Sequence, residues 1–175
     1  MMNQFEFLSP QKLPPLSYGW SDSPWGKLFL VFAGENLFGL GLAKDSTNSQ
    51  IIPYFEKRLK ATLHTRNDDQ SQEIAKKLGK SPIVCKAIGT PFQHQVWKAL
   101  LQIPEGQTRT YSEIASIAGN PNAIRATGSA IGKNPVSILI PCHRALPKSG
   151  GVGNFLWGSH FKKSLLASES AKIFQ

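Results

Sequence analysis

A cysteine followed directly by a histidine and an arginine, Cys142-His143-Arg144, is the stretch of this sequence best suited to chemistry. A thiolate is a strong nucleophile, and cationic neighbours lower the pKa of the thiol from which it forms. Residues 136–140 form an apolar run, so we expect the cysteine to stand where a strand or extended segment ends, just after Pro141. The alternative is a structural cysteine beside a surface His-Arg pair, because free cysteine is most often a small buried hydrophobe.

Short motifs surround this cysteine in a definite order. They are Gly-Thr-Pro-Phe-Gln at 89–93, Thr-Tyr at 110–111, Arg-Ala-Thr-Gly at 125–128, Asn-Pro at 134–135 and Leu-Leu-Ala-Ser-Glu at 165–169. This series resembles the O6-alkylguanine-DNA alkyltransferase family, also called methylated-DNA–protein-cysteine methyltransferases. The resemblance covers about residues 87 to 169, which is half of the chain.

The resemblance implies a DNA repair reaction. An alkyl group on O6 of guanine, and on O4 of thymine, would pass from duplex DNA to Cys142 in one irreversible turnover. His143 would take the thiol proton through a water, Glu169 would stabilise the resulting imidazolium, and Tyr111 would donate to the extruded base. We therefore also expect a depressed pKa for Cys142. Without the resemblance, Glu169 would be read as an exposed helix-end residue and Tyr111 as a core aromatic.

The same resemblance predicts contacts with the nucleic acid. It places the second helix of a helix-turn-helix in the minor groove, with Arg125 filling the gap that the flipped base leaves. The residues expected to contact DNA are Thr110, Tyr111, Ser112, Asn120, Ala123, Arg125, Ala126, Gly128 and Lys148. The residues expected to line the base pocket are Asn134, Ala145, Phe155, Leu156 and Trp157.

Other interpretations stay open on the residues alone. The small side chains of the helix expected at 122–132 fit tight helix packing as well as a close approach to DNA. The chain could also bind alkylated DNA without reacting, act as a helix-turn-helix regulator, or be a Cys-His hydrolase. The reactive Cys142 argues against the first of these functions, and no evident oxyanion-hole signature supports the last.

Charge and composition favour a polyanionic partner. The 175 residues carry a net charge of +9, and residues 87–175 hold nine Lys and Arg against three Asp and Glu. A basic excess of this kind suits nucleic acid, although a merely soluble basic surface would look the same. We expect double-stranded DNA with O6-alkylguanine as partner, a monomer, and no cofactor.

Cysteine usage and the lack of apolar runs predict the compartment. Cys85 and Cys142 are the only cysteines, and a disulfide between them would block the proposed nucleophile. No secretory signal or membrane-length apolar run is evident, so we expect a cytoplasmic protein, associated with the nucleoid when bound to DNA. Zinc-type Cys/His spacing is also lacking, so we expect no metal.

The pattern of apolar residues predicts an α+β chain of two domains. Residues 1–86 would form an α/β domain with an antiparallel sheet, ribonuclease H-like by resemblance, and residues 87–175 a mainly helical, winged-helix-like domain. The first is expected to contain an irregular lead-in at 1–17, a hairpin of 27–32 with 36–42, helices at 51–63 and 70–78, and a link at 79–90. The second is expected to contain helices at 91–103, 111–118 and 122–132, and a last helix through Phe161, Leu165 and Leu166.

Overall fold

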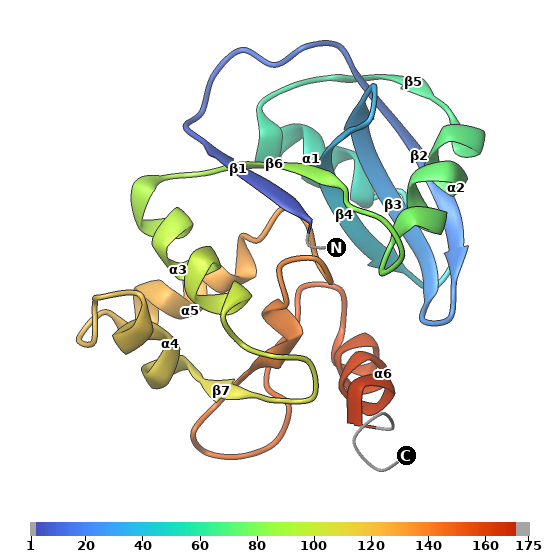
Figure 1. Cartoon of the computed structure of the whole chain (residues 1–175). Helices are drawn as coiled ribbons and strands as arrows, with labels where there is room; N and C mark the ends of the chain where they lie inside the picture. The colour runs from blue at the N-terminus through green and yellow to red at the C-terminus, as the bar shows by residue number, and fades with distance from the viewer. Residues whose placement is uncertain (1–2, 171–175) are drawn as a thin grey trace. The chain divides into compact units, whose positions relative to one another are not determined.

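The computed structural model describes residues 3–170, and the chain divides into two compact units, Met1–Gly89 and Thr90–Gln175 (Figure 1). Both units contain helices and strands, so the expected mixture of the two kinds of element is confirmed. Within residues 3–170, no helix has the length and apolar character needed to cross a membrane.

The first unit is built on a six-stranded sheet. In sequence the strands are β1 (Gln4–Leu8), β2 (Leu16–Ser23), β3 (Gly26–Ala33), β4 (Asn36–Ala43), β5 (Leu63–Arg66) and β6 (Val84–Ile88). In space their order is β1-β6-β4-β3-β2-β5. The expected hairpin is confirmed, because β3 and β4 pair antiparallel across the turn at Gly34.

Two helices pack on this sheet, α1 (Ile51–Leu59) and α2 (Asp68–Lys77). Helix α1 buries an apolar stripe that includes Phe55, whose ring contacts Phe29 of β3. Gly39 lies so close to Phe55 that an added Cβ would approach its ring to 2.6 Å. The left-handed Lys60 ends α1 before residue 63, where the sequence pattern had extended the helix.

Several expectations for this unit were wrong. Residues 4–8 are strand β1 rather than irregular, and the supposed link contains strand β6. The sheet is mixed rather than antiparallel, since β1 and β4 both pair parallel with β6, and β5 pairs parallel with β2. Parallel partners come from distant parts of the chain, so no local turn signal announces them.

The second unit begins with helix α3 (Pro91–Leu101), which Thr90 and Gln93 start with a capping box. Next come α4 (Tyr111–Ile117) and α5 (Ile124–Gly132), joined by a turn in which Gly119 has φ +79°. The indole of Trp97 on α3 is fully buried and donates to the Ala130 carbonyl of α5 at 2.9 Å. Trp97 is therefore part of the core that joins these two helices.

The remaining elements carry the Cys-His-Arg motif. Strand β7 (Arg109–Thr110) pairs parallel with β8 (Ala145–Leu146), which directly follows a short 3-10 helix, Cys142–Arg144. Helix α6 (Ser159–Ser170) then packs against that 3-10 helix (Figure 1). The predicted helices of this half are all present, with bounds within about two residues at α3, α4 and α5.

Candidate active site

Cys142 follows a tight turn rather than a strand. Ile138 has φ +73°, which is rare for a β-branched residue. The Ile140 N–H donates to the Val136 carbonyl at 3.0 Å, and the Cys142 N–H donates to the Ile140 carbonyl at 2.8 Å. The expected extended segment is reduced to one isolated bridge between Ser137 and Ile140. The chain thus folds back on itself, and Ser137 and Cys142 line the same pocket.

The side chain of Asn134 stabilises this turn through hydrogen bonds to its backbone. Its side chain is buried, its amide donates to the Ile140 carbonyl at 2.8 Å, and its oxygen accepts from the Val136 N–H at 3.0 Å. Asn134 comes two residues after the end of α5, so one side chain links the helix-turn-helix to the turn before Cys142. Asn134 therefore supports the turn as well as lining the pocket, as expected.

Glu169 contacts both residues that follow the cysteine, His143 and Arg144. Its carboxylate lies 2.7 Å from His143 Nε2, and the Arg144 guanidinium donates to it at 3.0 and 2.8 Å. Arg144 also donates to the Ile103 carbonyl at 2.6 Å, so its role in this site is to hold the geometry. Burial opposes the carboxylate charge, but the hydrogen bonds and charges of His143 and Arg144 outweigh it and lower the pKa of Glu169 to about 2. Glu169 is therefore ionised at neutral pH.

The ionised carboxylate decides the role of each nitrogen of His143. The Glu169 carboxylate can only accept the hydrogen bond, so Nε2 of a neutral imidazole must carry the ring proton. Nδ1 then keeps its lone pair. His143 is 1% exposed, and its Nδ1 makes no hydrogen bond within residues 3–170. A buried and oriented imidazole nitrogen is suited to accept a proton from the neighbouring thiol.

The electrostatics of Cys142 differ from the sequence-based expectation. Burial raises the pKa of its thiol, and hydrogen bonds from Asn134 and Ser137 together with the charge of Lys162 only partly oppose this. The expected depressed pKa is therefore wrong for the resting pocket, because desolvation penalises the thiolate more than its neighbours stabilise it. A nucleophilic Cys142 would therefore need a base, and Nδ1 of the adjacent His143, which makes no hydrogen bond within residues 3–170, is the candidate.

Lys162 is a functional candidate that the sequence reading missed. It lies on α6, is completely buried, and its ammonium donates to the Ala145 carbonyl at 2.6 Å and to the Asn154 carbonyl at 3.4 Å. Burial lowers the pKa of Lys162, and the charge of Cys142 opposes that shift. Within residues 3–170 it forms no ion pair with a carboxylate, so the thiolate is its natural counter-ion. The sequence signal that could have identified Lys162 is its position three residues before Leu165, within the apolar stripe of the last helix.

Tyr111 opens α4 and reaches the same pocket. Burial raises the pKa of its phenol, and the Cys142 thiolate raises it further. The hydroxyl therefore keeps its proton at neutral pH and can donate a hydrogen bond to a base bound beside it. Gly153 stays close to this hydroxyl, since a Cβ there would stand 3.5 Å from Tyr111 Oη and 2.9 Å from Pro147.

The pocket beside Cys142 has a volume of about 400 Å³, which suits a small ligand. Its lining is Tyr111, Gly128, Ile131, Gly132, Asn134, Ser137, Cys142, Asn154, Phe155 and Leu156. Of the predicted pocket residues, Asn134, Phe155 and Leu156 belong to this lining. Ala145 and Trp157 do not: Ala145 is buried with its carbonyl on Lys162, and the Trp157 indole donates to Ser137 Oγ at 2.7 Å.

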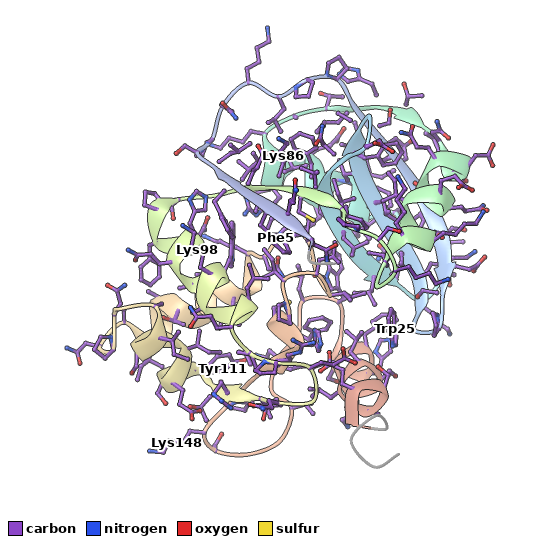
Figure 2. All side chains as sticks on the ribbon, in the orientation of Figure 1. Phe5, Trp25, Lys86, Lys98, Tyr111 and Lys148 are labelled. Carbon is purple, nitrogen blue, oxygen red and sulfur yellow. The ribbon has the colours of Figure 1, made fainter. Side chains whose placement is uncertain are left out.

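The expected DNA-contacting residues lie at the surface of the helix pair or on a nearby loop. Arg125, Ala126 and Lys148 are exposed, and the Lys148 side chain points outward from the loop after β8 (Figure 2). The partly exposed members are Thr110, Tyr111, Ser112, Asn120, Ala123 and Gly128. Thr110 caps α4, and the Asn120 amide donates to Gln95 and to the Ala118 carbonyl, so both also support the local fold.

The small residues of α5 separate the two interpretations of that helix. Its buried face carries Thr127, Ala130 and Ile131. A Cβ added at Gly128 or Gly132 would meet nothing within 4 Å. Tight packing inside the protein therefore does not require these two glycines, whereas an external surface that approaches the helix closely would benefit from them.

The two cysteines have different chemistry, and both are free. Burial raises the pKa of Cys85 in β6 to about 12, so this thiol is inert at neutral pH. No group of three or more His, Cys, Asp or Glu side chains within residues 3–170 is arranged to hold a metal ion.

Comparison with known proteins links this site to characterised relatives. Residues 91–171 match the family model of the 6-O-methylguanine DNA methyltransferase DNA-binding domain. A probable methylated-DNA–protein-cysteine methyltransferase of Acanthamoeba polyphaga mimivirus is 51% identical over 43% of this chain and 54% of its own. The methylated-DNA–protein-cysteine methyltransferase of Haemophilus influenzae is 34% identical over 88% of this chain and 86% of its own. The chain thus spans about half the length of the mimivirus relative but most of the Haemophilus one.

Solved structures extend the similarity to the fold. The O6-methylguanine methyltransferase of Mycobacterium tuberculosis superposes with a TM-score of 0.71 at 33% identity, covering 91% of this chain and 99% of the other. A second crystal structure of the Mycobacterium tuberculosis protein was solved as a complex with DNA. It superposes with a TM-score of 0.71 at 32% identity, covering 89% of this chain and 94% of that one. Both matches extend through the two units.

Proposed function

The chain belongs to the methylated-DNA–protein-cysteine methyltransferase family, and from that premise we propose that it repairs alkylated DNA with its own cysteine. The alkyl group on O6 of guanine, or on O4 of thymine, passes from duplex DNA to Cys142. The observation that carries this proposal is the buried thiol of Cys142, which shares one pocket with the Tyr111 hydroxyl and directly precedes a histidine held by Glu169.

The reaction begins with proton transfer. Burial keeps the Cys142 thiol protonated in the resting pocket, so its proton moves to His143 Nδ1, through one water. Glu169 stabilises the imidazolium through the proton on Nε2, and Arg144 keeps Glu169 in place. The sulfur lone pair then forms the S–C bond to the methyl carbon, and the electron pair of the C–O bond stays on guanine O6.

Tyr111 prevents the leaving base from departing as an anion. Its phenol, which stays protonated at neutral pH, donates toward N3 of guanine as negative charge builds up on the ring. The proton that the thiol gave to His143 passes through water to the base, so guanine is released neutral and His143 returns to its neutral form. The electrons and protons thereby balance: a thiol becomes a thioether, and O6-methylguanine becomes guanine.

The thioether product makes the protein a stoichiometric reagent. A thiolate is a poor leaving group from carbon, so the methyl group on Cys142 cannot be passed on. The other cysteine, Cys85, has a pKa of about 12 and belongs to the first unit, where it offers no reactive thiolate. The protein therefore reacts once.

DNA recognition rests on the exposed face of α5. Gly128 and Gly132 leave open space beside the helix, Arg125 is exposed on it, and within residues 3–170 the Arg125 side chain makes no hydrogen bond or ion pair. We assign this face to the minor groove, where readout depends little on sequence, and Arg125 to the gap left by the flipped base. The Mycobacterium tuberculosis relative was solved in complex with DNA, which supports DNA binding in general. The groove and the role of Arg125 rest on the exposed face of α5.

Finer features of the architecture belong to the same proposal. We assign the first unit to a ribonuclease H-like domain and the second unit to a winged-helix-like domain that holds the active site. The boundary lies after Gly89 rather than after residue 86, because β6 continues to Ile88 and pairs with β1. The protein would act as a monomer in the cytoplasm on double-stranded DNA that contains O6-alkylguanine. The grounds are family membership and the basic second half of the chain.

A turnover experiment tests the function. Purified protein is mixed with an excess of duplex oligonucleotide carrying one O6-methylguanine, and the repaired base is quantified by nucleoside analysis over time. We expect guanine to appear until one equivalent per protein molecule has formed, and then to stop. Binding without guanine formation would indicate a non-reactive lesion-binding protein, and continued turnover would rule out a self-inactivating mechanism.

A further inference from the structure

A hydrogen bond joins the loop around the pocket to the turn that precedes the nucleophile. Trp157 lies in the loop at 150–158, and its indole N–H donates to Ser137 Oγ at 2.7 Å. Ser137 is 2% exposed and lines the pocket together with Cys142. Neither residue was assigned a chemical role by the motifs around Cys142.

The donor capacities of the two groups set the direction of this bond. An indole nitrogen can only donate, so the Ser137 oxygen must accept from it. A hydroxyl has one hydrogen to give, and the contact with Trp157 leaves that hydrogen for another acceptor. The sulfur of Cys142 lines the same pocket and can accept that hydrogen. A hydrogen bond from Ser137 opposes the rise that burial causes in the pKa of the Cys142 thiol.

The backbone keeps both partners in place. The turn with left-handed Ile138 is closed by a hydrogen bond from Leu139 N–H to the Ser137 carbonyl at 2.9 Å. On the loop side, Gly158 has φ +111° and its N–H donates to the Phe155 carbonyl at 3.0 Å, which closes a turn around Trp157. The side chains of Ser137 and Trp157 therefore meet between two tight turns.

From this geometry we propose that Trp157 is a positioning residue, which orients the Ser137 hydroxyl so that it donates its hydrogen to the Cys142 sulfur and stabilises the thiolate. This inference rests on the proposed function, because it takes Cys142 as the nucleophile. It goes beyond that function because it gives the loop at 150–158 a role in stabilising the Cys142 thiolate. A hydroxyl without the indole can rotate toward other acceptors, and the sulfur then loses a donor at the moment it becomes charged.

Other ionisable groups also surround the sulfur and must be kept constant in a test. They are Tyr111 on α4, His143 beside Cys142 and Lys162 on α6. Substitutions at Ser137 and Trp157 leave all three in place. If substitutions at Ser137 and at Trp157 shift the pH dependence of Cys142 alkylation in the same direction, the cause is then the Ser137 hydroxyl and its orientation.

The test is the pH dependence of Cys142 alkylation by iodoacetamide, followed by mass spectrometry of the Cys142 peptide. This reaction needs no DNA, so it is informative even if the repair function fails. The variants are Ser137→Ala, Trp157→Phe, the double substitution and Ser137→Thr, which retains a hydroxyl. Trp25→Phe, in the turn between β2 and β3, is the control for loss of an indole elsewhere. Thermal unfolding of each variant checks that it is folded.

We expect Ser137→Ala to move the alkylation curve to higher pH and to slow the reaction at neutral pH about tenfold, as loss of a hydrogen bond to a charged group would. Trp157→Phe should shift the curve in the same direction, and the double variant should behave like Ser137→Ala alone. Ser137→Thr should restore most of the rate, and Trp25→Phe should match the unsubstituted protein. A Trp157→Phe curve identical to wild type, or additive effects in the double variant, would overturn the proposal.

Discussion

His143 and Glu169 are 26 residues apart in the chain, yet His143 Nε2 lies 2.7 Å from the Glu169 carboxylate. This contact joins the 3-10 helix that carries the nucleophile to the last helix of the described chain. It fixes which nitrogen of the imidazole holds the proton and leaves Nδ1 free to accept another. In the proposed mechanism, the base that accepts the thiol proton is therefore oriented before DNA binds.

Glu169→Gln should weaken both the reaction and the fold. The amide cannot stabilise an imidazolium by charge, and it leaves the half-buried guanidinium of Arg144 without its counter-ion. We expect methyl transfer to slow by at least tenfold, measured in single-turnover assays with duplex DNA. A variant that transfers methyl at the wild-type rate would remove Glu169 from the proton path.

The same carboxylate should make the stability of the protein depend on pH in the acid range. Its folded pKa of about 2 is below the usual value of 4.5, so its contribution to stability is complete above pH 4.5 and is lost as the pH falls toward 2. After allowance for solvent screening, the contribution is on the order of 2 kcal/mol. Urea unfolding between pH 5 and about 2 should show a steeper loss for wild type than for Glu169→Gln. Parallel curves would contradict the assignment.

Lys162→Met should make the Cys142 thiolate harder to form. It removes the buried positive charge whose natural counter-ion is the thiolate, together with the donor to the Ala145 carbonyl. We expect the rate of alkylation of Cys142 to fall about tenfold at neutral pH and its pH profile to move upward. The matched control is Lys163→Met, since Lys163 is the next residue of α6 and is exposed. Equal effects of the two substitutions would indicate a general charge effect rather than a role in the pocket.

Arg125→Ala should separate base extrusion from chemistry. In duplex DNA the variant loses the side chain assigned to the vacated stack, whereas the free O6-methylguanine base requires no extrusion. We expect a large loss of rate on duplex and almost none on free base, and a salt dependence of DNA binding that is lower by about one unit. Arg125→Lys, which keeps the charge but not the planar group, should restore the salt dependence but not the full rate. Equal slowing on both substrates would mean that Arg125 supports the pocket structurally.

Gly153→Ala should distort the loop around Tyr111. The residue has φ +66°, and a Cβ would come within 2.9 Å of Pro147 and 3.5 Å of Tyr111 Oη. Gly151→Ala is the matched control, because Gly151 has φ +73° but nothing within 4 Å of the added carbon. Both should lose about 1 kcal/mol of unfolding free energy from backbone strain, and only Gly153→Ala should also slow methyl transfer. If both variants react equally fast, the contact with Tyr111 does not matter for the reaction.

Local patterns predicted much of this fold. The β3–β4 hairpin and helices α3, α4 and α5 followed from β-rich runs, turn residues and apolar periodicity. Strands β1, β2, β5 and β6 were not predicted. Strands β1 and β6 pair in parallel between positions such as Phe5 and Cys85, about eighty residues apart, and no hairpin turn marks them.

The site was predictable to the extent that its residues belong to motifs. Cys142 and His143 were singled out by their residue types, whereas the roles of Glu169 and Tyr111 came from the family resemblance. The structure places these residues around one pocket or in contact with its nucleophile-bearing helix. The left-handed Ile138 was not predictable, since β-branched residues rarely adopt that conformation. Burial also decided the pKa of Cys142, and burial depends on packing that no local pattern contains.

Mass spectrometry of the protein after reaction tests the central claim most directly. Wild type and Cys142→Ser are each incubated with duplex DNA containing O6-methylguanine, digested, and searched for the added methyl group. We predict one methyl group on the wild-type peptide that contains Cys142 and none on the serine variant, while both proteins bind the DNA. Methyl transfer by Cys142→Ser, or a methyl group on any other residue of the wild-type protein, would contradict the account.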